Sequence, residues 1–179
     1  KTEYPRGKIP IKHEFTYLGT TINSFLDDQA DTMDRIKKAG ASWAQIKLVL
    51  EQDMPLRIKG MIFETYVLSV LTYGSQAWSG QRNLIRRLEV FCNKCYRTIC
   101  RISVVQMREK GIHMKDIRGW LGLKNIEYYT CRNAMRWLGH MSRMGGERIP
   151  KRMLYAWIPD RDRKKGGGNR TSFGKYALD

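Results

Sequence analysis

Apolar side chains recur every three or four residues along most of the chain after residue 23, and this periodicity constrains the fold more than any other feature. Such spacing returns successive side chains to one face of an α-helix. The most regular stripe, with intervals of 4, 3, 4 and 4, consists of Leu84, Leu88, Phe91, Cys95 and Ile99. The sequence therefore predicts a long helix here, with one face turned toward a core.

Other segments predict further helices on the same grounds. Residues 56–71 are apolar nearly all round, so we expect this helix to be the most buried one. The helix before it has its apolar positions at Met33, Ile36, Trp43, Ile46 and Leu50. A short helix is expected at residues 114–121, ended by Gly122. A longer helix is expected at residues 125–144, with an apolar face made of Tyr128, Cys131, Met135 and Leu138.

The two ends of the chain differ from this helical middle. Residues 1–23 mix β-branched and aromatic side chains with proline and glycine, which is typical of short strands joined by turns. Residues 159–179 are basic and rich in glycine, which is typical of an extended tail. We therefore expect a mainly α protein with a short β segment at 1–23, a helical domain at 24–158 and a basic tail at 159–179.

The net charge indicates the class of partner. The chain has 33 Lys and Arg against 17 Asp and Glu, a net charge of +16, which favours binding to a polyanion. An anionic membrane is the weaker alternative, because the longest apolar stretch, residues 66–73, is much shorter than the roughly 20 residues that span a bilayer. We therefore expect nucleic acid as the partner and no membrane.

The cysteines indicate the cellular compartment, and the first residue indicates how the chain is produced. Four cysteines without a secretory signal indicate a reducing, intracellular environment, and the mitochondrion, the nucleus and the cytoplasm all stay open. Because the chain begins with Lys1 rather than methionine, we expect a fragment or a processed form.

Basic side chains form stripes of their own, and these are the candidate RNA-binding residues. One predicted helix carries Arg86, Arg87, Lys94, Arg97 and Arg101, another carries Arg132, Arg136, His140 and Arg143, and the tail carries Arg161, Arg163, Lys164, Lys165 and Arg170. A single stripe of this kind is usually a solvated face. Two stripes and a basic tail together favour phosphate binding, since the forked guanidinium of arginine matches phosphate oxygens. Cations beside glycines can follow an irregular backbone, which favours folded RNA over duplex DNA.

Two motifs suggest chemistry, and for each the structural interpretation is the stronger one. Asp27 and Asp28 resemble the paired carboxylates of a polymerase, but they precede a helix, where acidic residues stabilise the free N–H groups. Cys92 and Cys95 form a CxxC motif inside a predicted helix, where free cysteines are common core residues. We expect no catalytic residue, no metal site and no cofactor. On spacing alone, a zinc site made of Cys92, Cys95, Cys131 and His140 stays open.

A series of short segments, in the same order, carries a resemblance to a known family. The segments are residues 14–22, 35–39, 67–75 with Trp78, 87–91, 94–95, 136–144 and 149–151. They resemble the region that follows the catalytic motif in LINE-type non-LTR retrotransposon reverse transcriptases, and the likeness covers about residues 1–159. It implies that residues 1–3 follow the active-site strand of the palm, that Tyr17, Leu18 and Gly19 form the turn supporting the primer end, and that the rest is a helical, thumb-like region. The glycine-rich end at 167–173 only echoes the family pattern.

The resemblance and the charge together lead to one functional hypothesis. The metal-binding aspartates of the family would precede residue 1, so we expect a non-catalytic, RNA-binding structural subunit of a ribonucleoprotein, such as an organellar ribosome, with RNA and neighbouring proteins as partners. The main alternative is the C-terminal nucleic-acid-binding piece of an active non-LTR retrotransposon reverse transcriptase. A third possibility is an interaction scaffold whose basic faces meet acidic proteins.

Overall fold

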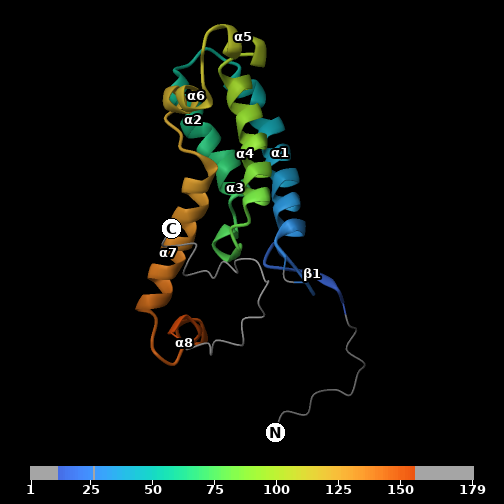
Figure 1. Cartoon of the computed structure of the whole chain (residues 1–179), viewed down its shortest axis with the longest axis vertical. Helices are drawn as coiled ribbons and strands as arrows, with labels where there is room; N and C mark the ends of the chain where they lie inside the picture. The colour runs from blue at the N-terminus through green and yellow to red at the C-terminus, as the bar shows by residue number, and fades with distance from the viewer. Residues whose placement is uncertain (1–11, 26, 156–179) are drawn as a thin grey trace, which may run out of the picture.

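The computed structural model describes residues 12–25 and 27–155 and confirms a mainly helical fold with a short N-terminal β-hairpin (Figure 1). In chain order its elements are β1 (Glu14–Tyr17), β2 (Thr20–Asn23), α1 (Gln29–Leu50), α2 (Leu56–Phe63), the π-helical turn η1 (Glu64–Leu68), α3 (Ser69–Leu71), the 3-10 turn η2 (Ser75–Ala77), α4 (Arg82–Ile99), α5 (Val104–Glu109), α6 (Met114–Leu121), α7 (Ile126–Arg143) and α8 (Ile149–Tyr155). Residues 1–11 and the predicted basic tail lie outside the described residues.

The hairpin forms because a two-residue turn joins two short strands. β1 and β2 pair antiparallel, with Tyr17 opposite Thr20 and Glu14 opposite Asn23. Leu18 and Gly19 make the turn with φ values of +47° and +84°. Two consecutive positive φ angles are the geometry that matches the right-handed twist of the flanking strands. This confirms the predicted strands within residues 12–23.

The core lies where α1, the helix 56–71 and α4 pack together. Phe63, Val67 and Leu71 from the middle segment are fully buried, as are Leu88 and Tyr96 of α4. The ring of Phe63 meets Trp43 of α1 at 5.8 Å and Tyr96 at 5.2 Å between centroids, both edge to face. Edge-to-face aromatic pairs add to the stabilisation that burial alone provides. The predicted stripe of α4 faces this core, with four of its members buried and Phe91 partly buried.

The helix at residues 56–71 differs from the prediction in two ways. It is continuous, but its middle is the π-helical turn η1, which contains one extra residue per turn. It is also not buried all round, because Ile58, Met61 and Tyr66 are exposed. One side packs on the core and α6, while the side that carries these three residues is exposed to solvent. The apolar composition of residues 56–71 therefore overestimates how much of this helix is buried.

The apolar face predicted for the helix at residues 125–144 is wrong. Helix α7 begins and ends close to the predicted residues, with Asn125 as its N-cap, but Tyr128 and Met135 are exposed. The buried side is instead made of Ile126, Tyr129, Thr130, Ala134 and Met141. Small side chains on this side allow α7 to approach the turn η2 closely. The error is a rotation of the helix and not a misplaced boundary.

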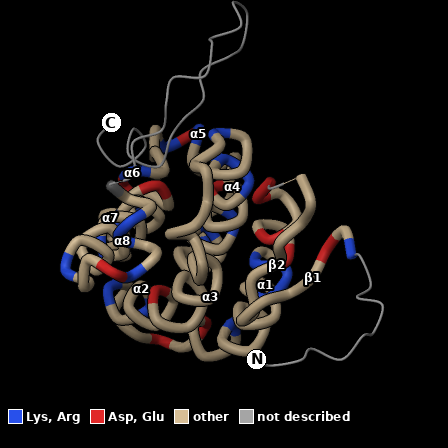
Figure 2. Tube along the Cα trace, turned by 90° about the horizontal axis from the view of Figure 1, so that it is seen from below, with Lys and Arg blue, Asp and Glu red and all other residues tan. Residues whose placement is uncertain are grey.

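The arrangement of the helices separates the two predicted basic stripes. Seen along the bundle, α7 and α1 lie on opposite sides of α3 (Figure 2). In Figure 1, α4 runs up toward α5, while α7 runs down toward α8. The cations at the end of α7 therefore lie at the other end of the molecule from those at the end of α4.

Candidate nucleic-acid interface

Helix α4 carries the first predicted stripe on the side opposite its buried apolar face. Arg86, Arg87 and Lys94 are exposed, and Arg97 is half-buried with its Nε donating to the carbonyl of Asn93 at 3.3 Å. Arg101 has a different role. One of its terminal nitrogens donates to the carbonyl of Glu51, the C-cap of α1, at 2.6 Å. That contact satisfies a free carbonyl at a helix end.

A groove with a basic rim lies between α1 and α4, and we call it the α1–α4 groove. It has a volume of about 650 Å³. Its lining residues are Met33, Ile36, Arg82, Asn83, Arg86, Arg87 and Val90. The aliphatic side chains come from both helices, whereas all three arginines come from α4. The structure thus places two predicted binding residues, Arg86 and Arg87, beside an apolar surface that sequence reasoning had not found.

A second groove lies where α4 meets α5 and the start of α6, and we call it the α4–α6 groove. Its volume is about 480 Å³. Its lining residues are Val90, Asn93, Arg97, Val104, Met107, Arg108, Gly111, Ile112, His113 and Met114. It combines two arginines with an amide and an imidazole over an aliphatic floor. Arg97 was predicted, but Arg108 and His113 were missed because α5 and α6 reach this groove only in the folded chain.

The stripe on α7 is not uniformly exposed. Arg136, His140 and Arg143 are exposed, and the ring of His140 lies 5.4 Å from that of the partly exposed Trp137. Arg132 is held against the protein, since it pairs with Glu64 at 3.5 Å and lies over the Tyr129 ring at 5.0 Å. Arg161, Arg163, Lys164, Lys165 and Arg170 lie outside the described residues.

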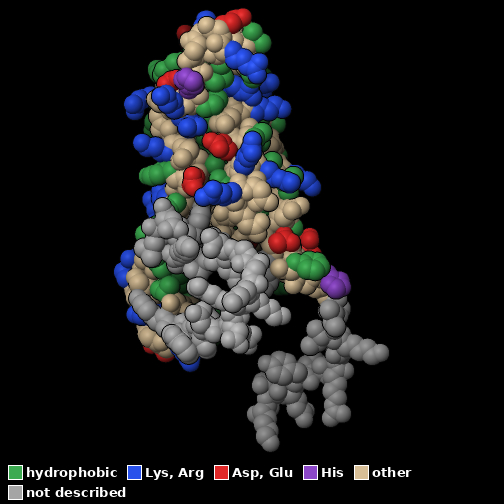
Figure 3. All heavy atoms as spheres, in the orientation of Figure 1, with side chains coloured by type: hydrophobic (Ala, Val, Ile, Leu, Met, Phe, Trp, Pro, Cys, Tyr) green, Lys and Arg blue, Asp and Glu red, His purple; other side chains and the backbone are tan. Residues whose placement is uncertain are grey.

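A cation is available to bind a ligand phosphate only where no carboxylate of the protein pairs with it. Within residues 12–25 and 27–155, ion pairs join Asp31 to Arg35, Asp34 to Lys38, Glu51 to Lys47, Glu89 to Arg118 and Glu64 to Arg132. Of the predicted binding residues in this part of the chain, only Arg132 is in such a pair. Figure 3 shows Lys and Arg side chains spread over the upper half of the molecule, with fewer Asp and Glu among them. This surface is suited to a polyanion.

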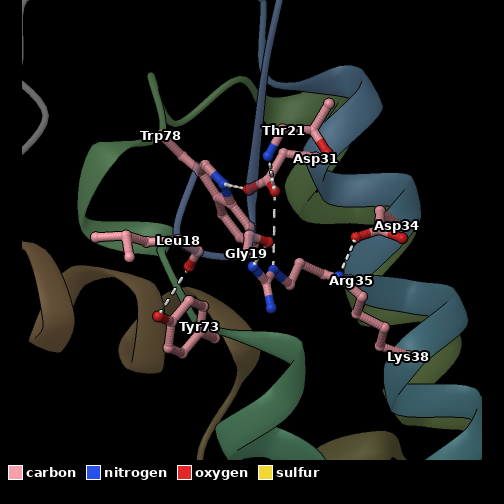
Figure 4. Close-up of polar contacts among 9 residues, drawn as sticks. All are labelled: Leu18, Gly19, Thr21, Asp31, Asp34, Arg35, Lys38, Tyr73 and Trp78. Carbon is pink, nitrogen blue, oxygen red and sulfur yellow. Dashed lines mark hydrogen bonds and ion pairs between the residues drawn. The ribbon is translucent and has the colours of Figure 1, made fainter. Parts of the chain in front are cut away.

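A polar cluster around the buried Asp31 and Arg35 fixes the hairpin to the helices (Figure 4). The carboxylate of Asp31 accepts from the backbone N–H of Thr21 at 3.0 Å and from the indole Nε1 of Trp78 at 2.8 Å. Arg35 lies 3.8 Å from Asp31, donates to the carbonyl of Gly19 and stacks over the ring of Tyr73 at 4.4 Å. The phenol of Tyr73 donates to the carbonyl of Leu18 at 3.1 Å. The cluster therefore joins β2, α1 and the segment around η2.

The paired aspartates before α1 make structural hydrogen bonds, one local and two to a distant segment. Asp27 accepts from the backbone N–H of Gln29 at 3.0 Å. Asp28 accepts from both the backbone N–H and the hydroxyl of Ser79, each at 2.6 Å. The first bond agrees with the predicted role at a helix start, while the second joins α1 to the segment that precedes α4.

The four candidate zinc ligands are not brought together. Cys92 and Cys95 are buried in the core, and burial raises the pKa of each thiol to about 12. Cys131 and His140 are nine positions apart on α7, which corresponds to about 13 Å along the axis. Among residues 12–25 and 27–155, no three His, Cys, Asp or Glu side chains are grouped so that they could hold a metal ion.

Cysteine alkylation tests this placement. With iodoacetamide at pH 8, we expect Cys92 and Cys95 to react at least about tenfold more slowly than the partly exposed Cys131, because the thiolate is the nucleophile and raised pKa values keep it scarce. Mass spectrometry of tryptic peptides gives the rate at each site. In urea, all four cysteines should react alike. Equal rates in the native protein, or a rate at Cys92 that rises on adding a zinc chelator, would contradict the core assignment.

Comparison with known proteins finds similarity to an uncharacterised transposon-derived protein of Caenorhabditis elegans. The two sequences are 28% identical over 130 residues, which cover 73% of this chain and 47% of the relative. The chain thus spans about half the length of the curated relative it matches. No protein-family model matches the chain, and no solved structure matches it. The similarity indicates a transposon origin.

In the described part of the chain, no helix has the length and apolar character needed to cross a bilayer.

Proposed function

We propose that this chain is a non-catalytic, RNA-binding structural subunit of a ribonucleoprotein, such as an organellar ribosome, and that it derives from a reverse transcriptase fragment. The observation that carries the proposal is the α4–α6 groove. There Arg97 and Arg108 stand beside Asn93 and His113 without a carboxylate partner in the described chain. Cations supply attraction to phosphate, and the imidazole of His113 and the amide N–H groups of Asn93 supply hydrogen bonds to base edges or ribose.

The shape of the surface supports RNA over duplex DNA. Direct reading of duplex DNA uses a helix or ribbon that enters the major groove, whereas the cations of the α4–α6 groove line a concavity. Unpaired RNA bases can enter such a concavity and contact its aliphatic floor at Met107 and Ile112. On α7, Trp137 beside Arg136 and His140 offers a stacking surface with nearby charge. We propose these two areas as the RNA interface.

Charge removal in the two areas tests RNA binding. We expect Arg97→Gln with Arg108→Gln, or Arg136→Gln with Arg143→Gln, to weaken binding of a structured RNA by about tenfold per pair at 0.15 M salt. Each lost phosphate contact should also reduce the slope of log affinity against log salt by about 0.7–0.9. Fluorescence anisotropy across a salt series measures both quantities, and circular dichroism checks that each variant folds.

The matched control removes two charges elsewhere. Lys38 and Lys47 lie on α1 and pair with Asp34 and Glu51. Lys38→Gln with Lys47→Gln changes the net charge equally, so it should weaken RNA binding by less than about threefold if the interface is localised. A control that loses as much affinity as the groove variants would mean that only the overall charge of +16 matters.

Similarity to a transposon-derived protein favours a second candidate, the C-terminal nucleic-acid-binding piece of an active non-LTR retrotransposon reverse transcriptase. Recovery of the protein from its native source, followed by sequencing of the bound RNA, distinguishes the two. A stoichiometric structural RNA supports the ribonucleoprotein subunit and identifies its compartment. A transcript that encodes the protein itself supports the enzyme.

A further inference from the structure

The α1–α4 groove differs in chemistry from the α4–α6 groove, although both are bordered by arginine. Met33 and Ile36 of α1 and Val90 of α4 give it an aliphatic floor, and Arg82, Arg86 and Arg87 stand around it. Its lining residues include no carboxylate. An occupant that satisfies both parts must be anionic along its edges and apolar on the face toward the floor.

The groove offers little to a nucleobase. Asn83 is the one neutral polar side chain in the lining, and its Oδ1 already accepts from the backbone N–H of Leu84 at 2.9 Å. The donor groups of a base placed on the aliphatic floor would lose hydrogen bonds to water without replacement, because the guanidinium groups of the lining can only donate. The amide and imidazole that meet this need elsewhere, Asn93 and His113, line the other groove.

The spacing of the groove residues along α4 matches the spacing of side chains along one face of a second helix placed beside it. Arg82, Arg86 and Val90 follow one another at four-residue intervals, as do Asn83 and Arg87, so each step is about 6 Å along the axis. Carboxylates at i and i+4 on a helix lying parallel to α4 have the same spacing. Met33 and Ile36, three residues apart on α1, supply the α1 side of the aliphatic floor. Helices that bind in grooves insert apolar side chains at i, i+3, i+4 and i+7, which suits this floor.

We propose that the α1–α4 groove is a docking site for an acidic amphipathic helix of a partner protein. The partner's apolar face covers Met33, Ile36 and Val90, and its carboxylates pair with Arg82, Arg86 and Arg87. A second copy of this chain is a poor occupant, because two chains of charge +16 repel each other. The inference goes beyond RNA binding, since it assigns this groove to protein contact.

The test uses the full chain and a synthetic peptide. The probe is a helix of about 18 residues, or five turns, with leucine at i, i+3, i+4 and i+7 and glutamates flanking that face. The control peptide has the same composition in permuted order, so that its charge is equal and its apolar face is lost. At 0.15 M salt we expect the amphipathic peptide to bind at least about tenfold more tightly than the permuted one by anisotropy.

Variants separate this site from the RNA interface. Met33→Gln and Arg82→Gln each change a residue that lines the α1–α4 groove alone, and each should weaken peptide binding about fivefold or more while RNA affinity changes by less than about threefold. Arg108→Gln should do the reverse. Equal binding of the permuted peptide would show that only charge is recognised and would overturn the proposal. Loss of RNA affinity in Met33→Gln and Arg82→Gln, with peptide affinity kept, would assign the groove to RNA.

Discussion

Replacement of Asp31 by alanine is expected to lower the free energy of unfolding by about 3–5 kcal/mol, because it leaves a buried arginine without its counter-charge. Asp31 and Arg35 have exposed fractions of only 2% and 5%. The substitution also removes the acceptor for the N–H of Thr21 and the indole of Trp78. The hairpin and the segment that leads into α4 therefore each lose one of their attachments to α1.

Urea denaturation followed by tryptophan fluorescence measures this effect, and Trp78 reports on the cluster directly. Asp34→Ala is the matched control on the same helix. Asp34 pairs with Lys38 at 2.6 Å on the surface, where an ion pair contributes less than about 1 kcal/mol. We expect the control to unfold almost like the unmodified protein. A loss of less than about 1 kcal/mol in Asp31→Ala would contradict the view that this cluster holds the hairpin.

A double substitution isolates the uncompensated charge from the lost hydrogen bonds. Asp31→Leu combined with Arg35→Met should cost less than the sum of the two single changes, because the pair is removed together. The remaining loss then reflects the contacts to Thr21, Trp78 and Gly19.

Local sequence rules predicted the helices well because most helix signals lie within a few residues. The stripe of α4, the Gly122 end of α6 and the Asn125 start of α7 all follow from spacing and capping. The helix α5 was missed although its signal is equally local. Ser103 and Gln106 form a capping box in which each side chain bonds the other residue's backbone N–H.

Long-range contacts explain what the sequence could not predict. Asp31 is one of several acidic residues near the start of α1, yet its partners Thr21 and Trp78 are 10 and 47 positions away. The rotation of α7 depends on Asn133, which donates to the carbonyl of Thr72 at 3.2 Å and to the hydroxyl of Ser75 at 3.0 Å. A prediction from apolar spacing places Tyr128 and Met135 in the core. It gives no weight to Asn133, which forms hydrogen bonds to a distant turn.

In the candidate site, too, local spacing predicts some features, while others depend on long-range contacts. Spacing on α4 placed Arg86, Arg87 and Lys94 correctly on its solvent side, because the apolar stripe fixes which side is buried. The grooves depend on which helices lie next to α4, so Arg82 and Arg108 gained significance only from the fold. Arg101 and Arg132 make contacts to Glu51 and Glu64 from distant segments, and no local pattern indicates these.

Gly60→Ala is expected to destabilise the protein by about 2 kcal/mol or more, although alanine is normally the better helix residue by about 1 kcal/mol. Gly60 is buried in α2, where α2 packs on α6. A Cβ atom at this position would lie 1.9 Å from the carbonyl oxygen of Leu121 and 2.9 Å from its carbonyl carbon. These are backbone atoms at the end of α6, so no side chain can rotate away, and α6 itself must move.

Gly119→Ala is the matched control, because Gly119 lies in α6 with nothing within 4 Å of an added Cβ. Chemical denaturation should show a gain of up to about 1 kcal/mol for this variant and a loss for Gly60→Ala. A neutral or stabilising Gly60→Ala would mean that α2 and α6 are farther apart than described. Because His113 and Met114 at the start of α6 line the α4–α6 groove, movement of α6 in Gly60→Ala should also weaken RNA binding under conditions where the variant is still folded. Stability and RNA affinity measured on the same pair of variants therefore test whether the close packing of Gly60 on Leu121 is what holds that groove in shape.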